Sequence, residues 1–173
     1  MKKYWYKTAM LVMALGVFTA CSDDDGPKIP EGPIALVNGA YVINTGNWNE
    51  NNGTIQWYDR DLKTVSADLF AAANGAGIGD AQDLCVYGTK IYITCSSSAK
   101  IEIVDRKDFK RIKTLNLTNE SGQPIQPRYM TAAKGNIYFT AYDGTVSQID
   151  TTSLSITKKI EVGGSHPEAL TSA

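Results

Sequence analysis

A pattern of roughly 45 residues occurs three times in this 173-residue chain. Each copy opens with a glycine turn and a strand of β-branched and aromatic residues, followed by a second strand that ends at an aspartate. The aspartates are Asp59, Asp105 and Asp150, spaced by 46 and 45 residues. Two more short strands are predicted per copy: a third ending at Phe70, Leu115 or Ile160, and a fourth beginning at Gln82, Arg128 or Glu168.

Four short strands per repeat are typical of a β-propeller blade, so the pattern predicts an all-β propeller. No segment after residue 21 shows helical periodicity, and a β-sandwich or β-solenoid is the alternative. Blades are expected near residues 33–80, 81–126 and 127–166, with another starting at 167–173. Because a closed ring needs about four to eight blades, we expect residues 33–173 to be an incomplete propeller domain. It would be the N-terminal part of a longer protein, or a truncated product with an unpaired edge.

The N-terminus has the pattern of an export signal. Three lysines (Lys2, Lys3 and Lys7) precede an apolar run from Ala9 to Phe18, and small residues lead to Cys21. The run is about half of the ~20 residues that span a bilayer, which favours a cleaved lipoprotein signal peptide over residues 1–20. Cys21 is then the predicted lipid attachment site, carrying acyl groups such as palmitate. A plain secretory signal or an uncleaved anchor is the alternative.

Residues 21–32 are rich in aspartate, proline and glycine, and we expect them to form a lipidated acidic tether. The segment Ser22 to Asp25 resembles the tag that sends Bacteroides-type lipoproteins to the cell surface, which favours the exterior of the outer membrane. Loss of three lysines from the 17 basic residues leaves 14 against 18 acidic ones, a net charge of −4. This balance argues against nucleic acid as a partner, and attachment to the membrane is expected through the lipid alone.

Cys85 and Cys95 are the cysteines that remain. Pairing their strands about the turn at Gly88 and Thr89 places Cys85 opposite residue 92 or 93. A disulfide would therefore need distortion, although an oxidising compartment would favour one.

Long loops are predicted on one face of the propeller, and tight turns on the other. The longest loop between the second and third strands of a blade runs from Thr45 to Gly53 and contains an indole among carboxamides. Such a surface suits a large ligand that is part ring and part amide or hydroxyl. The candidate ligand-binding residues are Asn47, Trp48, Asn49 and Asn52. Alternatively, Asn52-Gly53 makes an ordinary turn and Trp48 covers the end of the blade.

A second group of candidates lies near the expected mouth of the central channel: Arg128, Tyr129 and Tyr142. The first two begin an innermost strand, and Tyr142 lies in a short loop of the same repeat. They could contact a ligand together. Alternatively, Arg128 pairs with acids such as Asp83 or Glu168, and the tyrosines pack between blades.

Signals for catalysis are weak, so we expect a protein that is not an enzyme and needs no cofactor or metal. The single histidine, His166, has no nucleophile beside it. The glycine series 75, 77 and 79 follows no strand-to-helix transition, which argues against a dinucleotide site. Asp80 and Asp83 could form an acid and base pair or a calcium site, but loop carboxylates are usually solvated.

Several strings of residues resemble a known family. They are Asn44-Thr45-Gly46-Asn47-Trp48 with Asn51-Asn52-Gly53, the string from Gly79 to Asp83, and Pro127-Arg128-Tyr129 with Tyr142-Asp143-Gly144. Together they resemble the YncE-like propeller lipoproteins of the Bacteroides group, and residues 149–155 and 160–167 resemble YVTN-type repeats. The resemblance implies a seven-bladed propeller. In its BtuG-type branch, such proteins capture cobalamin for an outer-membrane transporter.

These observations predict a surface lipoprotein that binds a small molecule, with cobalamin or another corrinoid as the leading candidate, for delivery to a TonB-dependent transporter. An interaction or adhesion propeller that binds a protein or glycan is the alternative. A lactonase-like or quinone-dependent propeller enzyme is a third possibility, but it would require inward-facing acids and histidines that these residues scarcely provide.

Overall fold

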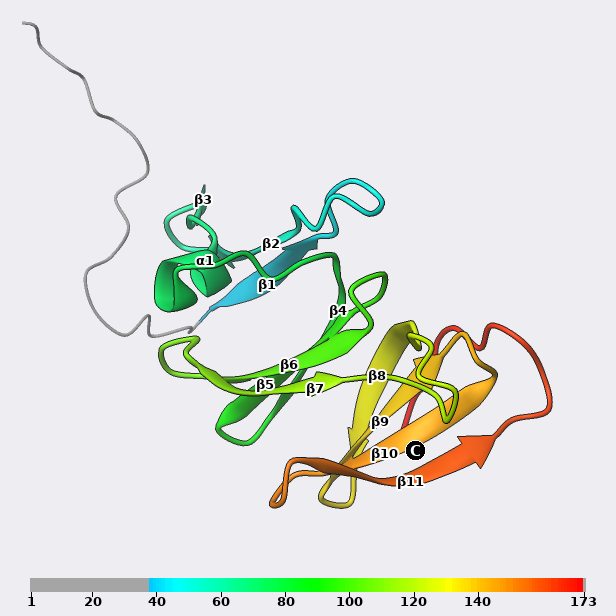
Figure 1. Ribbon diagram of the computed structural model, residues 1–173. Coiled ribbons are helices and arrows are strands. Elements are labelled where there is room, and N and C mark those ends of the chain that lie inside the picture. The colour runs from blue at the N-terminus through cyan, green and yellow to red at the C-terminus, as the bar shows by residue number, and fades with distance from the viewer. Residues whose placement is uncertain (1–37, 173) are drawn as a thin grey trace, which may run out of the picture.

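The computed structural model describes residues 38–172 (Figure 1). The predicted signal peptide, the lipidated Cys21 and the tether at 21–32 lie outside the described residues. None of the helices within 38–172 is long and apolar enough to cross a membrane.

Eleven strands form three antiparallel sheets, each built in chain order. The first sheet contains β1 (Gly39–Asn44), β2 (Thr54–Asp59) and β3 (Thr64–Val65). The second contains β4 (Ala81–Tyr87), β5 (Lys90–Cys95), β6 (Lys100–Asp105) and β7 (Arg111–Asn116). The third contains β8 (Pro127–Ala133), β9 (Asn136–Ala141), β10 (Thr145–Asp150) and β11 (Ser155–Glu161). We call these sheets blades 1, 2 and 3.

The repeated aspartates end β2, β6 and β10 and shape the turn that follows each of these strands. Asp59, Asp105 and Asp150 pair in register with Gly39, Lys90 and Asn136. The Asp59 carboxylate accepts hydrogen bonds from the backbone N–H groups of residues 61 and 62, both at 2.9 Å. Asp150 does the same for residues 152 and 153. The repeat signal is therefore a turn-capping signal, as expected for aspartate in tight turns.

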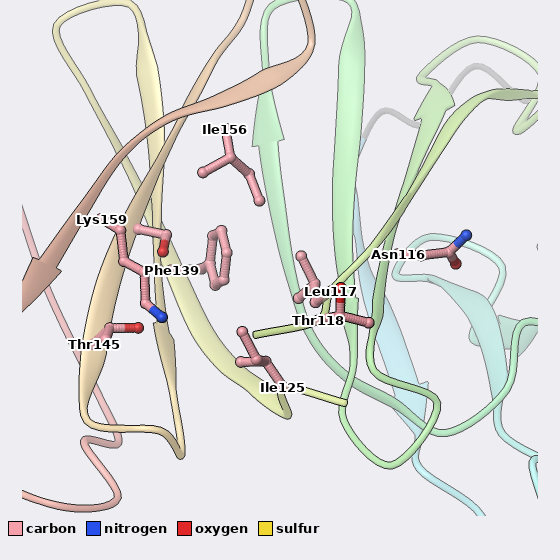
Figure 2. A pocket seen from close by; sticks show the side chains of 9 residues that line it. Asn116, Leu117, Thr118, Ile125, Phe139, Thr145, Ile156 and Lys159 are labelled. Atoms are coloured by element: carbon pink, nitrogen blue, oxygen red, sulfur yellow. The ribbon is translucent and has the colours of Figure 1, made fainter. Parts of the chain in front are cut away.

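The cores lie between neighbouring blades, because the central strands of blade 2, β5 and β6, bury both of their faces. In β5, Ile91 and Ile93 face blade 1, while Tyr92 faces blade 3. A cavity of about 190 Å³ lies between blades 2 and 3, and Figure 2 shows the side chains that line it. Its apolar lining comes from Leu117 and Ile125 of the connection after β7, and from Phe139 and Ile156 of blade 3.

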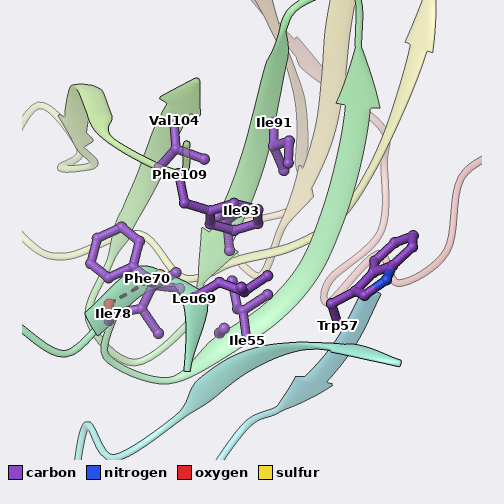
Figure 3. Packing of buried hydrophobic residues seen from close by; sticks show 11 residues of the cluster. Ile55, Trp57, Leu69, Phe70, Ile78, Ile91, Ile93, Val104 and Phe109 are labelled. Atoms are coloured by element: carbon purple, nitrogen blue, oxygen red, sulfur yellow. Dashed lines mark hydrogen bonds between the residues drawn. The ribbon is translucent and has the colours of Figure 1, made fainter. Parts of the chain in front are cut away.

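A short helix, α1 (Leu69–Asn74), helps to fill the corresponding space between blades 1 and 2 (Figure 3). The prediction of a strand ending at Phe70 was wrong: β3 has only two residues, and Phe70 lies in the helix, fully buried. Asp68 caps the helix through a 3.1 Å hydrogen bond from the Phe70 N–H, and Gly75 ends it at φ 66°. Six residues are too few to display helical periodicity, which is why the sequence did not reveal α1.

The cysteines are not joined: Cys85 and Cys95 are both free thiols. Cys85 lies opposite Tyr92, as the hairpin pairing predicted, and Cys95 lies opposite Ala81. Burial raises the pKa of Cys95 to about 12, so this thiol is a core side chain rather than a reactive group.

Candidate functional site

The long loops extend from one end of the three sheets. β1, β5 and β9 all end there, and the connections that enter β4 and β8 begin there. In Figure 1 the cyan loop after β1 and the red C-terminal segment both lie on this side. We call this end the loop face, and the opposite end, where the tight turns lie, the turn face.

The loop from Thr45 to Gly53 is held together by its own polar side chains. The Glu50 carboxylate accepts hydrogen bonds from the Asn47 and Asn52 carboxamides at 2.7 and 3.0 Å. The Asn52 side-chain oxygen in turn accepts from the Asn47 backbone N–H at 2.8 Å. Asn49 adopts the left-handed conformation, with φ 62°, which asparagine tolerates better than most residues.

Trp48 projects from this loop with 63% of its surface exposed. The alternative in which Trp48 covers the end of the blade does not fit this exposure. The carboxamides of Asn47 and Asn52 are largely occupied within the loop, so the Trp48 indole and the exposed Asn49 side chain are the parts of this predicted site that are left accessible. Large exposed aromatic surfaces are common at binding sites.

The same loop is fixed to blade 2. The Gly53 N–H donates to the Gly79 carbonyl at 2.7 Å, and a side chain at Gly53 would meet that carbonyl oxygen at 2.5 Å. The Asn51 side-chain oxygen accepts from the Ser98 hydroxyl at 2.7 Å. Trp48 is therefore presented on a loop that two neighbouring blades support.

Asp80 organises the adjoining loop of blade 2. Its side chain is 2% exposed and accepts hydrogen bonds from the backbone N–H and the hydroxyl of both Ser97 and Ser98. Burial alone would raise the pKa of Asp80, but these four hydrogen bonds outweigh it and lower the pKa. Asp83 differs: burial raises its pKa, although its carboxylate accepts from the Met130 N–H at 2.7 Å. Both carboxylates thus have structural partners.

The described residues contain no group of three or more His, Cys, Asp or Glu side chains that could hold a metal ion. The Asp80 and Asp83 carboxylates, considered in the sequence as a calcium site, are instead directed to backbone and hydroxyl donors on different neighbours.

The second predicted group forms a polar cluster at the start of the innermost strands. The Arg128 guanidinium lies 4.7 Å from the centre of the Tyr142 ring and 5.7 Å from that of Tyr129. It pairs with Glu168 at 3.1 Å and donates to the Gln82 side chain at 2.8 Å. The structure therefore brings together all three predicted residues, and Arg128 pairs with Glu168 but not with Asp83.

Glu168 connects this cluster to the segment after blade 3. It accepts a 2.7 Å hydrogen bond from the Tyr142 hydroxyl, and this bond, together with the Arg128 charge, lowers the pKa of Glu168. The same bond raises the pKa of Tyr142. His166 packs its ring edge-on against Tyr142 at 4.6 Å. Because the charges in the cluster satisfy one another, it offers a ligand fewer free groups than the Trp48 loop does.

The pairing of Arg128 with Glu168 is one that the sequence had offered as an alternative, but the other partners that hold the two groups in place were missed. Glu50 and Ser98 support the Trp48 loop, and Gln82 accepts a hydrogen bond from Arg128. A signal for Gln82 was available, because Gln82, Arg128 and Glu168 occupy equivalent positions of successive repeats. Neighbouring blades bring such positions side by side.

Comparison with solved structures identifies the architecture. Hydrazine synthase from Kuenenia stuttgartiensis superposes with a TM-score of 0.57 at 13% identity, over 83% of this chain and 40% of that one. AztD from Citrobacter koseri, in its apo form, gives 0.50 at 18% identity, over 81% and 38%. A nidogen/laminin complex gives 0.51 at 16% identity, over 72% and 43%. At these identities the likeness concerns the fold alone.

No model of a known protein family matches the sequence, and no curated protein matches it either. The chain spans about 40% of the length of the solved structures named above. The described residues nevertheless define the class of fold: a β-propeller built from four-stranded blades, of which about three are present.

Proposed function

We propose that this protein is a lipid-anchored, surface-exposed propeller that binds a small molecule on its loop face. The observation that carries the proposal is Trp48, which is 63% exposed on a loop that is itself fixed by hydrogen bonds to Glu50 and Ser98. An indole that is exposed to water does not contribute to the folded core, which suggests that it takes part in binding. Because the loop is already ordered, the entropy cost of binding is lower.

The ligand we propose is cobalamin or another corrinoid. The resemblance of the Asn44 to Gly53 segment to the BtuG-type lipoproteins supports this choice. A flat ring with amide groups at its edge could lie on the Trp48 indole, while the Asn49 carboxamide and the loop backbone meet the amides. Delivery would be to a TonB-dependent transporter of the outer membrane, with the acyl groups on Cys21 holding the propeller near it. No catalytic step is required.

A protein or glycan partner is the second candidate. It is supported by the same exposure, because an aromatic side chain that projects from a loop can also insert into a partner surface. The neighbours in fold do not separate the two candidates, since their likeness to this chain is one of architecture.

The test is calorimetric titration of cyanocobalamin into the full chain in detergent. Saturable binding that weakens at least tenfold in Trp48→Ala is expected. Leu62→Ala is the matched control: its side chain is 72% exposed on the turn face, so its loss should leave binding unchanged. Absence of binding by the unaltered chain would refute the corrinoid proposal. Pull-down of a specific outer-membrane protein or glycan that depends on Trp48 would then support the second candidate.

A further inference from the structure

A second cavity lies on the turn face, at the end of the molecule opposite to Trp48. Its volume is about 370 Å³, within the range of small-molecule sites. It is bounded by the first strand of blade 1 and by the turns of blades 1 and 2. The lining residues are Asn38, Gly39, Ala40, Tyr41, Trp57, Arg60, Val86 and Arg106.

Two arginines give this cavity a positive charge. Arg60 and Arg106 follow the repeated aspartates Asp59 and Asp105, so the repeat places them at equivalent positions of adjacent blades. Their backbones are fixed: the Arg60 N–H donates to Asn38 at 3.1 Å, and the Arg106 N–H donates to Thr89 at 2.8 Å. In blade 3 the equivalent residue is the uncharged Thr151. The arginine pair is therefore not a general requirement of these turns.

Neither arginine is neutralised by another described residue. Within residues 38–172, no carboxylate lies within ion-pair distance of Arg60 or Arg106. The nearest acids in sequence have other partners: Asp59 and Asp105 accept from backbone N–H groups of their own turns, and Asp61 accepts from the Asn38 side chain at 2.5 Å. Two unpaired guanidinium groups beside one cavity attract an anion, and each can hold a carboxylate or phosphate through two parallel hydrogen bonds.

The wall of the cavity contributes an aromatic surface and an unsatisfied hydroxyl. Trp57 and Tyr41 pack edge to face at 5.1 Å. The Tyr41 hydroxyl is buried with no hydrogen-bond partner among the described residues. Burial raises the pKa of this hydroxyl, and the Arg106 guanidinium beside it opposes that rise, both by its charge and as a hydrogen-bond donor to the ionised oxygen. A buried hydroxyl without a partner is costly, so an oxygen atom brought in by a ligand would gain a hydrogen bond there.

We propose that this cavity binds a small organic anion, with its carboxylate between Arg60 and Arg106 and its apolar body against Trp57 and Val86. The site lies between different loops from those of the Trp48 site, so it is independent of the function proposed above. A phosphate ester would present the same oxyanion chemistry, and the experiment separates the two.

The test is calorimetric titration of the full chain in detergent with benzoate, phenyl phosphate and inorganic phosphate. Saturable binding of benzoate is expected, at least tenfold weaker in the double variant Arg60→Gln/Arg106→Gln. Lys107→Gln is the matched control, because it removes an exposed charge from the same turn without altering the lining. Tyr41→Phe should weaken binding several-fold while leaving the fold intact by circular dichroism. Trp48→Ala should have no effect, which separates this site from the loop face.

Three outcomes would overturn the proposal. One is the absence of benzoate binding by the unaltered chain. Another is equal weakening by Lys107→Gln and by the arginine variants, which would indicate general attraction to positive charge. The third is tighter binding of inorganic phosphate than of benzoate, since the aromatic wall would then have no role. If phenyl phosphate bound more tightly than either, the ligand would be a phosphate ester and not a carboxylate.

Discussion

The two interfaces between blades are built from the same repeat but closed in different ways. Between blades 1 and 2, α1 inserts Leu69 and Phe70, and both are buried. Between blades 2 and 3, the connection from residue 117 to 126 contains no helix, and the cavity of about 190 Å³ remains (Figure 2). The helix therefore adds two buried apolar side chains to the first interface, and no helix does so at the second.

The hydrogen bonds that join neighbouring blades also differ between the two interfaces. At the second interface, the Thr94 hydroxyl accepts from the Asp83 N–H at 3.0 Å and donates to the Arg128 carbonyl at 2.7 Å. Thr140 repeats this contact with the Tyr129 N–H and the Glu168 carbonyl at 3.1 and 2.7 Å. In blade 1 the equivalent residue is Ile43, which packs in the core instead. A threonine hydroxyl therefore links blades 2 and 3, whereas an apolar side chain occupies the equivalent position of blade 1.

The first interface also buries a charge. Glu102 is 1% exposed and accepts hydrogen bonds from Lys100 and Arg111, both at 2.9 Å, and from Thr114 at 2.7 Å. The Arg111 guanidinium lies 5.1 Å from the centre of the Phe70 ring, so the helix covers the ion pair. Burial alone would raise the pKa of Glu102, but these partners lower it. Repeats of one pattern can therefore differ in their apolar side chains and hydrogen bonds without a change of architecture.

Removal of the helix anchor should have the largest effect. Phe70→Ala is expected to lower the free energy of unfolding by about 4 kcal/mol, because it empties a fully buried aromatic site and uncovers the Glu102 ion pair. Urea unfolding followed by circular dichroism measures it, and Leu62→Ala should stay within about 0.5 kcal/mol of the unaltered chain. A loss below about 1 kcal/mol would show that α1 does not close the first interface.

Asp80→Ala is expected to cost about 3 kcal/mol, since the backbone N–H groups of Ser97 and Ser98 and the Ser97 hydroxyl lose their acceptor, while the Ser98 hydroxyl can still donate to Asn51. The folded state lowers the pKa of Asp80, so its contribution is present above the ordinary value of 3.8 and is lost as the pH falls below it. The difference in stability between the unaltered chain and the variant should therefore shrink between pH 5 and about pH 3. A constant difference would contradict the assigned role; Asp61→Ala, exposed in a turn, is the control.

Thr94→Val tests the threonine hydroxyl that links blades 2 and 3. The substitution preserves the shape of the side chain but removes the hydroxyl that accepts from the Asp83 N–H and donates to the Arg128 carbonyl. The free energy of unfolding is therefore expected to fall by about 1.5 kcal/mol. Thr64→Val, on the exposed strand β3, should change stability by no more than about 0.5 kcal/mol. If both substitutions had equally small effects, the Thr94 hydroxyl would not stabilise the second interface.

Enlarging a buried side chain should have the smallest effect on stability. The change should be stabilising at the second interface and destabilising at the first. Ser147 lines the cavity and is 5% exposed, so Ser147→Val is expected to stabilise the protein by about 0.5 kcal/mol. Ala81 is fully buried in the filled interface, where Ala81→Val should destabilise through overpacking by about 1 kcal/mol. Thermal unfolding of both variants measures this, and the same sign in both would mean that the two interfaces do not differ in packing.

The sequence was sufficient to predict the features that repeat. The β-hairpins, the aspartate turns and the position of Cys85 opposite Tyr92 follow from local alternation and turn chemistry. The helix was missed because six residues with a capping aspartate leave no periodic signal. The Trp48 loop was located, but its attachment through Ser98 could not be predicted, since the partners are 47 residues apart and each is an ordinary loop residue.

We propose that the loop face binds the ligand and that Trp48 makes the main contact with it. Hydrogen–deuterium exchange of the full chain in detergent, with and without saturating cyanocobalamin, tests it most directly. We predict slower exchange in residues 45–53, with no change in the turn at residues 59–63, and no protection in Trp48→Ala. Unchanged exchange in residues 45–53, or protection confined to residues 59–63, would contradict the account.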